Sequence, residues 1–178
     1  IEEPQEESLT LPSDPIIWMP FNNNTKDLSG NGLDGILYEG KYTTCRSLNE
    51  YSSLELDIDD DPSWGEENDR VEIKYDPILN VNTMTISAWV NLNEKTGDFA
   101  NRPYTVAGRF SHTIYGTKED KASYILQVDK DLKLSFSFRI GVYIRSQNSL
   151  NLNTWHHVVV SVGEEIKLYI DGKLEATE

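Results

Sequence analysis

Three carboxylates alternate along one short stretch, Glu-Leu-Asp-Ile-Asp, at Glu55, Asp57 and Asp59. Alternate residues of a β-strand point to the same face, so these three side chains would project side by side. Two carboxylates about 5 Å apart perform retaining glycoside hydrolysis, one as nucleophile and the other as acid/base. The alternative interpretation is a solvent-facing acidic edge, with Leu54 and Leu56 turned inward.

A second stretch, Asp-Leu-Ser-Gly-Asn-Gly-Leu-Asp-Gly over residues 27–35, has three interpretations. Its glycines have the G-x-G-x-x-G spacing of a dinucleotide-binding loop, and its first six residues match the start of a calcium loop. The third interpretation is a simple turn. A dinucleotide loop opens a helix whose N-terminus holds the pyrophosphate. The next residues, ILYEGKYTTC, do not favour a helix, so the dinucleotide interpretation is excluded.

The calcium interpretation depends on the oxygens of this stretch, because Ca²⁺ binds six to eight of them. Position twelve counted from Asp27 is Tyr38 and not Glu, which excludes an EF-hand. An irregular calcium loop remains one alternative. In the other, Asp27 and Asn31 form local Asx turns while the glycines adopt positive φ.

Composition excludes several classes of partner. Thirty acidic against sixteen basic residues give the chain a formal charge of -14, which repels nucleic acid and anionic membranes. One cysteine cannot form an internal disulfide. No apolar run has the length of a membrane-spanning helix.

The chain divides into a tail and one domain. Residues 1–14 are acidic and poor in large apolar side chains, which predicts a flexible tail or linker. From residue 15 the hydrophobic pattern has a period of two, in short segments bounded by Gly, Asn, Asp and Pro. We therefore predict one all-β domain over residues 15–178, an antiparallel sandwich or barrel without helices. The expected strands lie in IIWMPF, SSLELDID, RVEIKY, TMTISAWVNL, PYTVAGRF, SYILQVD, LKLSFSFRI, VYIRS, TWHHVVVSV and IKLYIDG.

The same alternation predicts the orientation of side chains. Within TMTISAWVNL one face holds Met84, Ile86, Ala88 and Val90, and the other holds Thr85, Ser87 and Trp89. Adjacent His156 and His157 must point to opposite faces, so they cannot share a metal. We expect His157 to form a hydrogen bond in the core beside Trp155. The Asp171-Gly172 pair predicts a two-residue hairpin turn.

Four stretches in order resemble one family: DLSGNGLDG, NDRVEI, TISAWVN, and NTWHHVVVSV closing with IKLYIDGKL. They are similar to LamG-like domains of the concanavalin A-like lectin and glucanase superfamily, which includes laminin G domains and pentraxins. The resemblance covers Pro15 to Ala176 and implies a concanavalin A-like jelly roll, a two-sheet antiparallel β-sandwich. Members usually continue with further strands after the hairpin, so we expect either that the sequence is a fragment lacking its last strands or that a neighbouring domain or a second chain completes the sheet.

The resemblance also bears on chemistry. Retaining β-glucanases of this superfamily carry an E-x-D-x-E strand, where this chain has the shorter Asp59 as its third acid. Other members bind calcium through irregular loops, which implies Asp27, Asn31 and Asp34 as Ca²⁺ ligands. No other cofactor is expected.

Aromatic and basic loop residues are the candidate ligand contacts. Trp64 lies in the acidic turn DDDPSWGEEND, where an exposed indole can stack on a sugar ring. The alternative is an indole folded onto its own loop. Arg102, Tyr104, Arg109 and Tyr115 lie in the long following connection and could line the same rim.

The leading prediction for function is a non-catalytic extracellular or cell-surface module that recognises glycan or another surface macromolecule. The alternatives are a protein-adhesion module and a retaining glycoside hydrolase using Glu55, Asp57 and Asp59. The fold resemblance alone does not decide among them.

Overall fold

The computed structural model describes residues 14–57, 69–93, 103–109, 124–138 and 142–178. It comprises two compact units, Ile1–Leu79 and Asn80–Glu178. The described part of the chain is all-β, with one short 3₁₀ helix and no α-helix, as the period of two predicts. Within that part, no helix is both long and apolar enough to cross a membrane.

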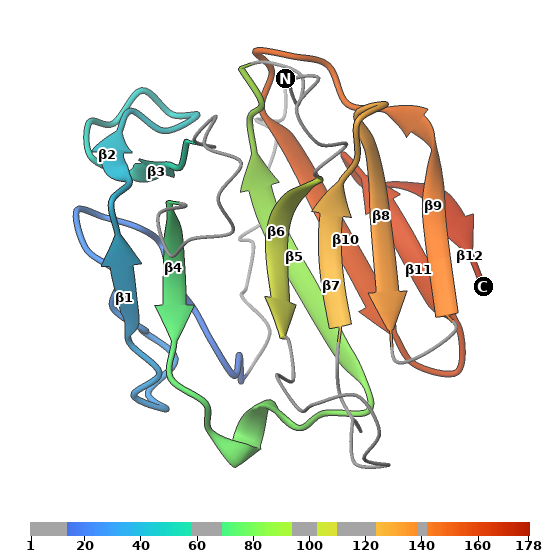
Figure 1. The fold of residues 1–178 in the computed structure, drawn as a ribbon, viewed down its shortest axis with the longest axis horizontal. Helices are drawn as coiled ribbons and strands as arrows, with labels where there is room; N and C mark the ends of the chain where they lie inside the picture. Colours follow the sequence, from blue (N-terminus) through green and yellow to red (C-terminus); the bar gives the residue numbers. More distant parts are fainter. Residues whose placement is uncertain (1–13, 58–68, 94–102, 110–123, 139–141) are drawn as a thin grey trace, which may run out of the picture. The chain divides into compact units, whose positions relative to one another are not determined.

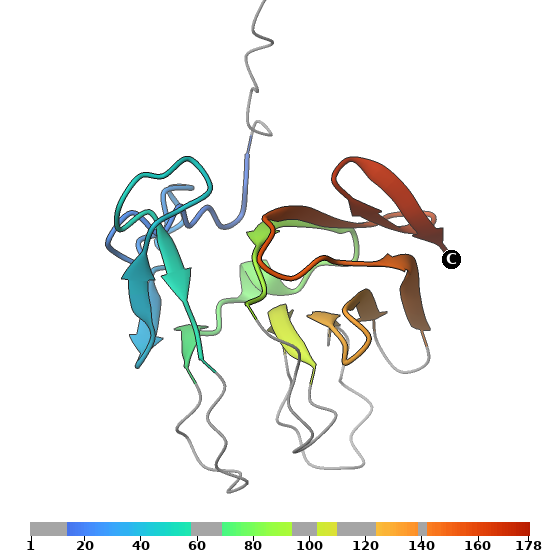
Figure 2. The same cartoon turned by 90° about the horizontal axis from the view of Figure 1, so that it is seen from above.

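The second unit is a sandwich of two four-stranded antiparallel sheets (Figure 1). One sheet has the order β12-β11-β10-β5, with β5 (Met84–Val90), β10 (His156–Val162), β11 (Ile166–Ile170) and β12 (Lys173–Thr177). The other has the order β6-β7-β8-β9, with β6 (Tyr104–Arg109), β7 (Tyr124–Val128), β8 (Lys133–Phe138) and β9 (Val142–Ser149). Figure 2 shows the two layers from above.

One hydrophobic core fills the space between these sheets. Its fully buried side chains come from both layers: Leu126, Val128, Leu134, Phe136, Val158, Val160 and Leu168. The predicted apolar face of β5 packs against this core, whereas Thr85, Ser87 and Trp89 are exposed. The two faces of β5 are therefore assigned correctly by alternation.

The hairpin between β11 and β12 turns at the predicted pair. Asp171 has φ 51° and Gly172 has φ 75°, the two positive values of a type I′ turn. This turn matches the twist of the flanking strands, so it sets the register in which Ile170 pairs with Lys173.

The first unit contains two small antiparallel pairs, β1 with β4 and β2 with β3. The elements are β1 (Gly35–Tyr38), β2 (Lys41–Thr43), β3 (Ser53–Glu55), β4 (Arg70–Ile73) and η1 (Pro77–Leu79). Gly35 is required in β1, because a Cβ there would lie 2.4 Å from the Val71 side chain.

Two expected strands differ from the prediction. The IIWMPF stretch forms no strand, because the Trp18 N–H bonds to a side chain, Asp27 Oδ1, and Phe21 adopts φ 56°, outside the β region. Among its described residues, 52–57, the SSLELDID stretch forms a strand only at Ser53–Glu55. Its pairing with β2 ends at Glu55, and the Asp57 N–H instead bonds to the carboxylate of Asp69.

Candidate functional site

The outer surface of the β6–β9 sheet, which faces the viewer in Figure 1, carries several polar side chains. Strand pairing places the following polar residues in neighbouring positions on this surface, which we call the polar face: Thr105, Gln127, Ser135, Ser137, Tyr143 and Arg145. The apolar Ile125, which pairs with Ser137, lies in the same row, and Ser135 is buried at 4% exposure. The residues of the polar face alternate with buried residues such as Leu126, Leu134, Phe136 and Ile144. The period of two thus supplies a core on one side and hydrogen-bonding groups on the other.

Arg145 is held in place by two carboxylates of the β7–β8 turn. Its Nε donates to Asp129 Oδ2 and its Nη2 donates to Asp131 Oδ2, each over 2.6 Å. Asp129 Oδ1 also accepts the backbone N–H groups of Asp131 and Lys133. The guanidinium is therefore fixed by charge-assisted bonds to a turn that is itself hydrogen-bonded.

These contacts shift the pKa values of Asp129, Asp131 and Arg145. Burial by itself raises the pKa of Asp129, but hydrogen bonds from Arg145 and the turn backbone bring it below its ordinary value. Hydrogen bonds from Arg145 and Lys130 lower the pKa of Asp131, and the two carboxylates raise that of Arg145. All three groups are charged at neutral pH.

Tyr143 provides the aromatic part of the polar face. It is 58% exposed on β9 and pairs with Ser137 of β8. Arg145 lies two residues further along the same strand, a separation of about 7 Å. An aromatic ring and a fixed hydrogen-bond donor therefore lie about one sugar ring apart.

The predicted calcium residues form a hydrogen-bonded turn in the first unit. Asp27 accepts four hydrogen bonds: Oδ1 from the N–H groups of Trp18 and Ser29, and Oδ2 from the Ser29 hydroxyl and the Leu33 N–H. Burial opposes ionisation, but these donors lower the pKa of Asp27 from 3.8 to about 2. The carboxylate is the organising centre of this turn.

The remaining residues of the turn are also engaged. The Asn31 amide donates to Ile16 O over 3.0 Å, and Asp34 Oδ1 accepts the Asp27 N–H over 2.8 Å. Gly30 and Gly32 have φ of 95° and 72°, as the Asx-turn alternative predicts. Within the described ranges, no three His, Cys, Asp or Glu side chains are grouped to hold a metal.

Calcium at this turn stays a prediction. A Ca²⁺ ion would have to displace N–H donors from both Asp27 oxygens. Equal melting temperatures in calcium and in chelator would contradict it, since a ligand bound to the native state raises stability.

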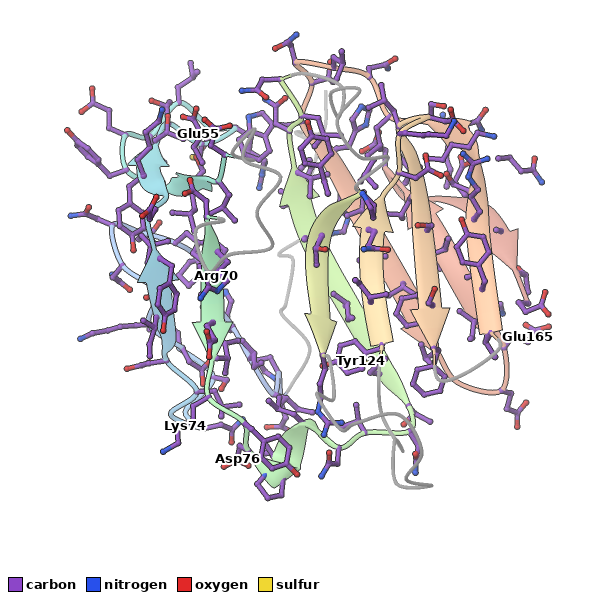
Figure 3. The ribbon with its side chains drawn as sticks, viewed as in Figure 1. Glu55, Arg70, Lys74, Asp76, Tyr124 and Glu165 are labelled. Atoms are coloured by element: carbon purple, nitrogen blue, oxygen red, sulfur yellow. The ribbon has the colours of Figure 1, made fainter. Side chains whose placement is uncertain are left out.

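Two of the alternating acids line an open cavity of about 260 Å³ in the first unit, together with Glu39, Lys41 and Asp69. Glu55, labelled in Figure 3, forms an ion pair with Lys41 over 3.2 Å. Asp57 lies at the end of this segment, where its N–H bonds to Asp69. Asp59, the third acid of the proposed hydrolase, lies outside the described residues.

The predicted ligand contacts are divided between described and undescribed segments. Trp64, Arg102 and Tyr115 lie outside the described residues. Tyr104 begins β6 and packs against the core, and Arg109 ends the same strand opposite Tyr124, which Figure 3 labels. Burial raises the pKa of Tyr124 despite the opposing charge of Arg109.

The two histidines point to opposite faces, but the expected assignment was wrong. His156 is the buried one: its Nε2 accepts the Asn151 N–H, so Nδ1 carries the proton that it donates to Asp171 Oδ2 over 2.7 Å. His157 lies on the outer face, hydrogen-bonded to Ser87 and stacked on Trp89 at 5.1 Å. Val158, Val160 and Val162 form the core face of β10, and His156 lies on the same face because it is separated from them by an even number of residues.

Sequence reasoning missed the Tyr143–Arg145 surface. The available signal was the alternation within KLSFSF and VYIRS, which places serines, Tyr143 and Arg145 away from the apolar residues. The partners of Arg145 lie 14 and 16 residues earlier in the chain, a contact that alternation does not reveal.

Comparisons with known proteins place the sandwich in a family. A family model described as the concanavalin A-like lectin/glucanases superfamily matches residues 65–178. The chain belongs to this superfamily. This confirms the family that the sequence motifs resemble, and the antiparallel two-sheet architecture agrees with it.

Two solved structures are similar to this member of the superfamily. The binding domain of Paraclostridial Mosquitocidal Protein 1 is 19% identical with a TM-score of 0.52, and the match covers 86% of this chain and 37% of that one. The carbohydrate binding module CBM66 from Bacillus subtilis is 14% identical with a TM-score of 0.42, covering 80% and 77%. The search of curated proteins found no match. At these identities the likeness concerns the fold alone.

Proposed function

We propose that this protein is a non-catalytic carbohydrate-binding module, acting outside the cell or on its surface, and that the polar face binds the glycan. The supporting observation is that Tyr143 is exposed beside the fixed Arg145. A sugar has an apolar C–H face and a rim of hydroxyl groups. The Tyr143 ring can stack on the C–H face, and Arg145 and Gln127 can form hydrogen bonds with the hydroxyl groups.

The floor of the polar face suits such a ligand. Ser137 is small and only half-buried, so a flat ring can approach the sheet beside Tyr143, whereas Ser135 is buried at 4% exposure. The superfamily includes lectins, which is consistent with a sugar ligand but does not by itself assign one.

The test is a glycan array followed by substitution of the aromatic residue. We expect a polysaccharide hit that weakens about fivefold in Tyr143→Ala, because an aromatic contact contributes about 1 kcal/mol. Tyr51→Ala is the matched control, since Tyr51 is 57% exposed in the first unit. A blank across plant, host and microbial glycans would contradict the proposal and favour the protein-adhesion alternative.

The cavity lined by Glu55 and Asp57 favours a second candidate, a retaining glycoside hydrolase. Its signature would be reducing sugar released from β-glucan by the wild type and lost in Glu55→Gln. We expect no release. Measured release that depends on Glu55 would replace the non-catalytic proposal.

A further inference from the structure

Four charged groups beside the polar face form one network of ion pairs. Arg145 bonds to both Asp129 and Asp131, and Lys130 lies 3.3 Å from the other oxygen of Asp131. Two cations and two carboxylates therefore form one network with no net charge. Lys133, at the start of β8, adds one positive charge in a chain whose formal charge is -14.

We infer that the polar face selects uncharged glycans and rejects anionic ones such as uronates and sulfated sugars. This inference rests on the proposed function and names the ligand class of the same surface. Arg145 is the one charged member of the polar face as defined above. An anionic sugar would be recognised through the positively charged guanidinium of Arg145.

The geometry of Arg145 disfavours an anionic sugar. Bidentate recognition of a carboxylate or sulfate uses two parallel N–H donors of the guanidinium. Here Nε and Nη2 are already bonded to carboxylates at 2.6 Å. A further anion would meet Asp129 and Asp131 as like charges, in a field made more negative by the whole acidic chain.

An uncharged sugar needs no pair of parallel N–H donors and is not repelled by the two carboxylates. A hydroxyl oxygen needs a single donor, and the guanidinium has five N–H groups, more than its two carboxylate bonds use. The two carboxylates hold the guanidinium so that little side-chain entropy is lost when a hydroxyl binds. Asp129 and Asp131 are thus positioning residues for Arg145.

The experiment compares affinities of the full chain for unsubstituted β-glucan and mannan with those for polygalacturonate and heparin. The wild type should bind its neutral ligand at least about tenfold more tightly than either polyanion at low ionic strength. Asp131→Asn removes one carboxylate and the charge assistance of its bond to Nη2 of Arg145, so the ratio of anionic to neutral affinity should rise about threefold or more. The increase should shrink at about 0.5 M salt, where screening is strong.

Glu164→Gln is the matched control. It makes the same change in net charge, but Glu164 lies in the exposed turn between β10 and β11, on the other sheet. Its selectivity ratio should equal that of the wild type. Asp131 is the test site in preference to Asp129, because the Asp129 side chain also accepts two backbone bonds of the turn.

The outcomes separate this inference from the proposed function. Wild type that binds no neutral or anionic glycan contradicts the proposed function itself. Wild type that binds polyanions as tightly as neutral glycans, or a folded Asp131→Asn variant with an unchanged ratio, overturns the selectivity alone. An unchanged melting temperature in Asp131→Asn shows that a changed ratio does not come from unfolding.

Discussion

Asp27 and Asp171 show how single carboxylates organise a turn in this protein. Asp27 joins Trp18, Ser29 and Leu33 through four hydrogen bonds. One oxygen of Asp171 accepts a hydrogen bond from the ring N–H of His156, and the other accepts one from the backbone N–H of His157. These two bonds connect the β11–β12 turn to β10. Burial raises the pKa of Asp171, but the bonds from the two histidines lower it overall.

The pKa of Asp27 predicts a pH dependence of stability. The folded value is about 2, below the ordinary 3.8. At pH values between about 2 and 4, the unfolded chain binds a proton that the folded chain does not, so stability falls as the pH drops through this window. Melting temperatures measured from pH 5 to pH 2 should decline in the wild type.

The decline should be shallower in Asp27→Asn, which has no carboxyl to titrate there. Asp171 contributes in the same direction, so part of the slope remains. Asp14→Asn, at an exposed position, should keep the full slope. A slope in Asp27→Asn equal to that of the wild type would refute this role for Asp27.

The residue scale also shows the limit of sequence prediction. The Asx-turn alternative for Asp27 follows from residues near it in the chain. The burial of His156 in place of His157 depends on which side of β10 meets the other sheet, which the apolar Val residues on both sides left ambiguous. The Arg145 network depends on the β7–β8 turn lying against β9, a tertiary contact with no local signal.

At the scale of elements, strands β9 and β12 link the two sheets at one edge. Glu175 of β12 is buried, and its carboxylate accepts the backbone N–H of Asn148 over 2.9 Å and that residue's side-chain amide over 3.1 Å. These bonds join the last strand of one sheet to the last strand of the other.

Removing this carboxylate should weaken the sandwich. Glu175→Ala removes the buried carboxylate that accepts the Asn148 N–H groups, and a hydrogen bond to a charged group contributes about 1.5–3 kcal/mol to the free energy of unfolding. Urea unfolding measures it. Glu178→Gln, an exposed position one strand end away, should change stability by less than about 0.5 kcal/mol. Equal stability of Glu175→Ala and wild type would show that water replaces the lost bonds.

Strands whose apolar and polar residues alternate were predictable, and the short strands β1 and β2 were not. β5 and β8 were found because apolar and polar residues alternate over their length. The strands β1 and β2 have four and three residues, which is too short for a period to be distinguished from irregular chain, and β3 was expected only as part of a longer strand. The IIWMPF stretch is apolar without alternation, and hydrogen bonding to Asp27 overrides its β propensity.

At the scale of the whole molecule, the hydrophobic core lies in the second unit. Every member of the buried cluster, from Leu126 to Ile170, and every partly buried residue packed on it belongs to residues 84–176. The prediction of one domain over residues 15–178 stays a prediction, beside the two compact units of the structure.

This distribution predicts that a chain of residues 80–178 unfolds cooperatively by itself. Its circular dichroism should be that of β-structure, and its thermal transition should be a single sigmoid, because the core cluster is intact. Phe136→Ala in the same shortened chain should lose about 3–5 kcal/mol, which shows that the transition reports the core. A gradual, non-cooperative melt of residues 80–178 would show that the first unit is required for folding.

The β6–β9 sheet is a meander, so the polar face is encoded by one uninterrupted segment, residues 104–149. Within its strands, alternate positions serve different purposes: one set fills the interior, and the other carries the polar face that we propose binds the ligand. Mutations at every second codon could therefore retune recognition while leaving the interior packing untouched. Ligand preference and thermal resistance are for this reason expected to diverge independently among descendants of this chain.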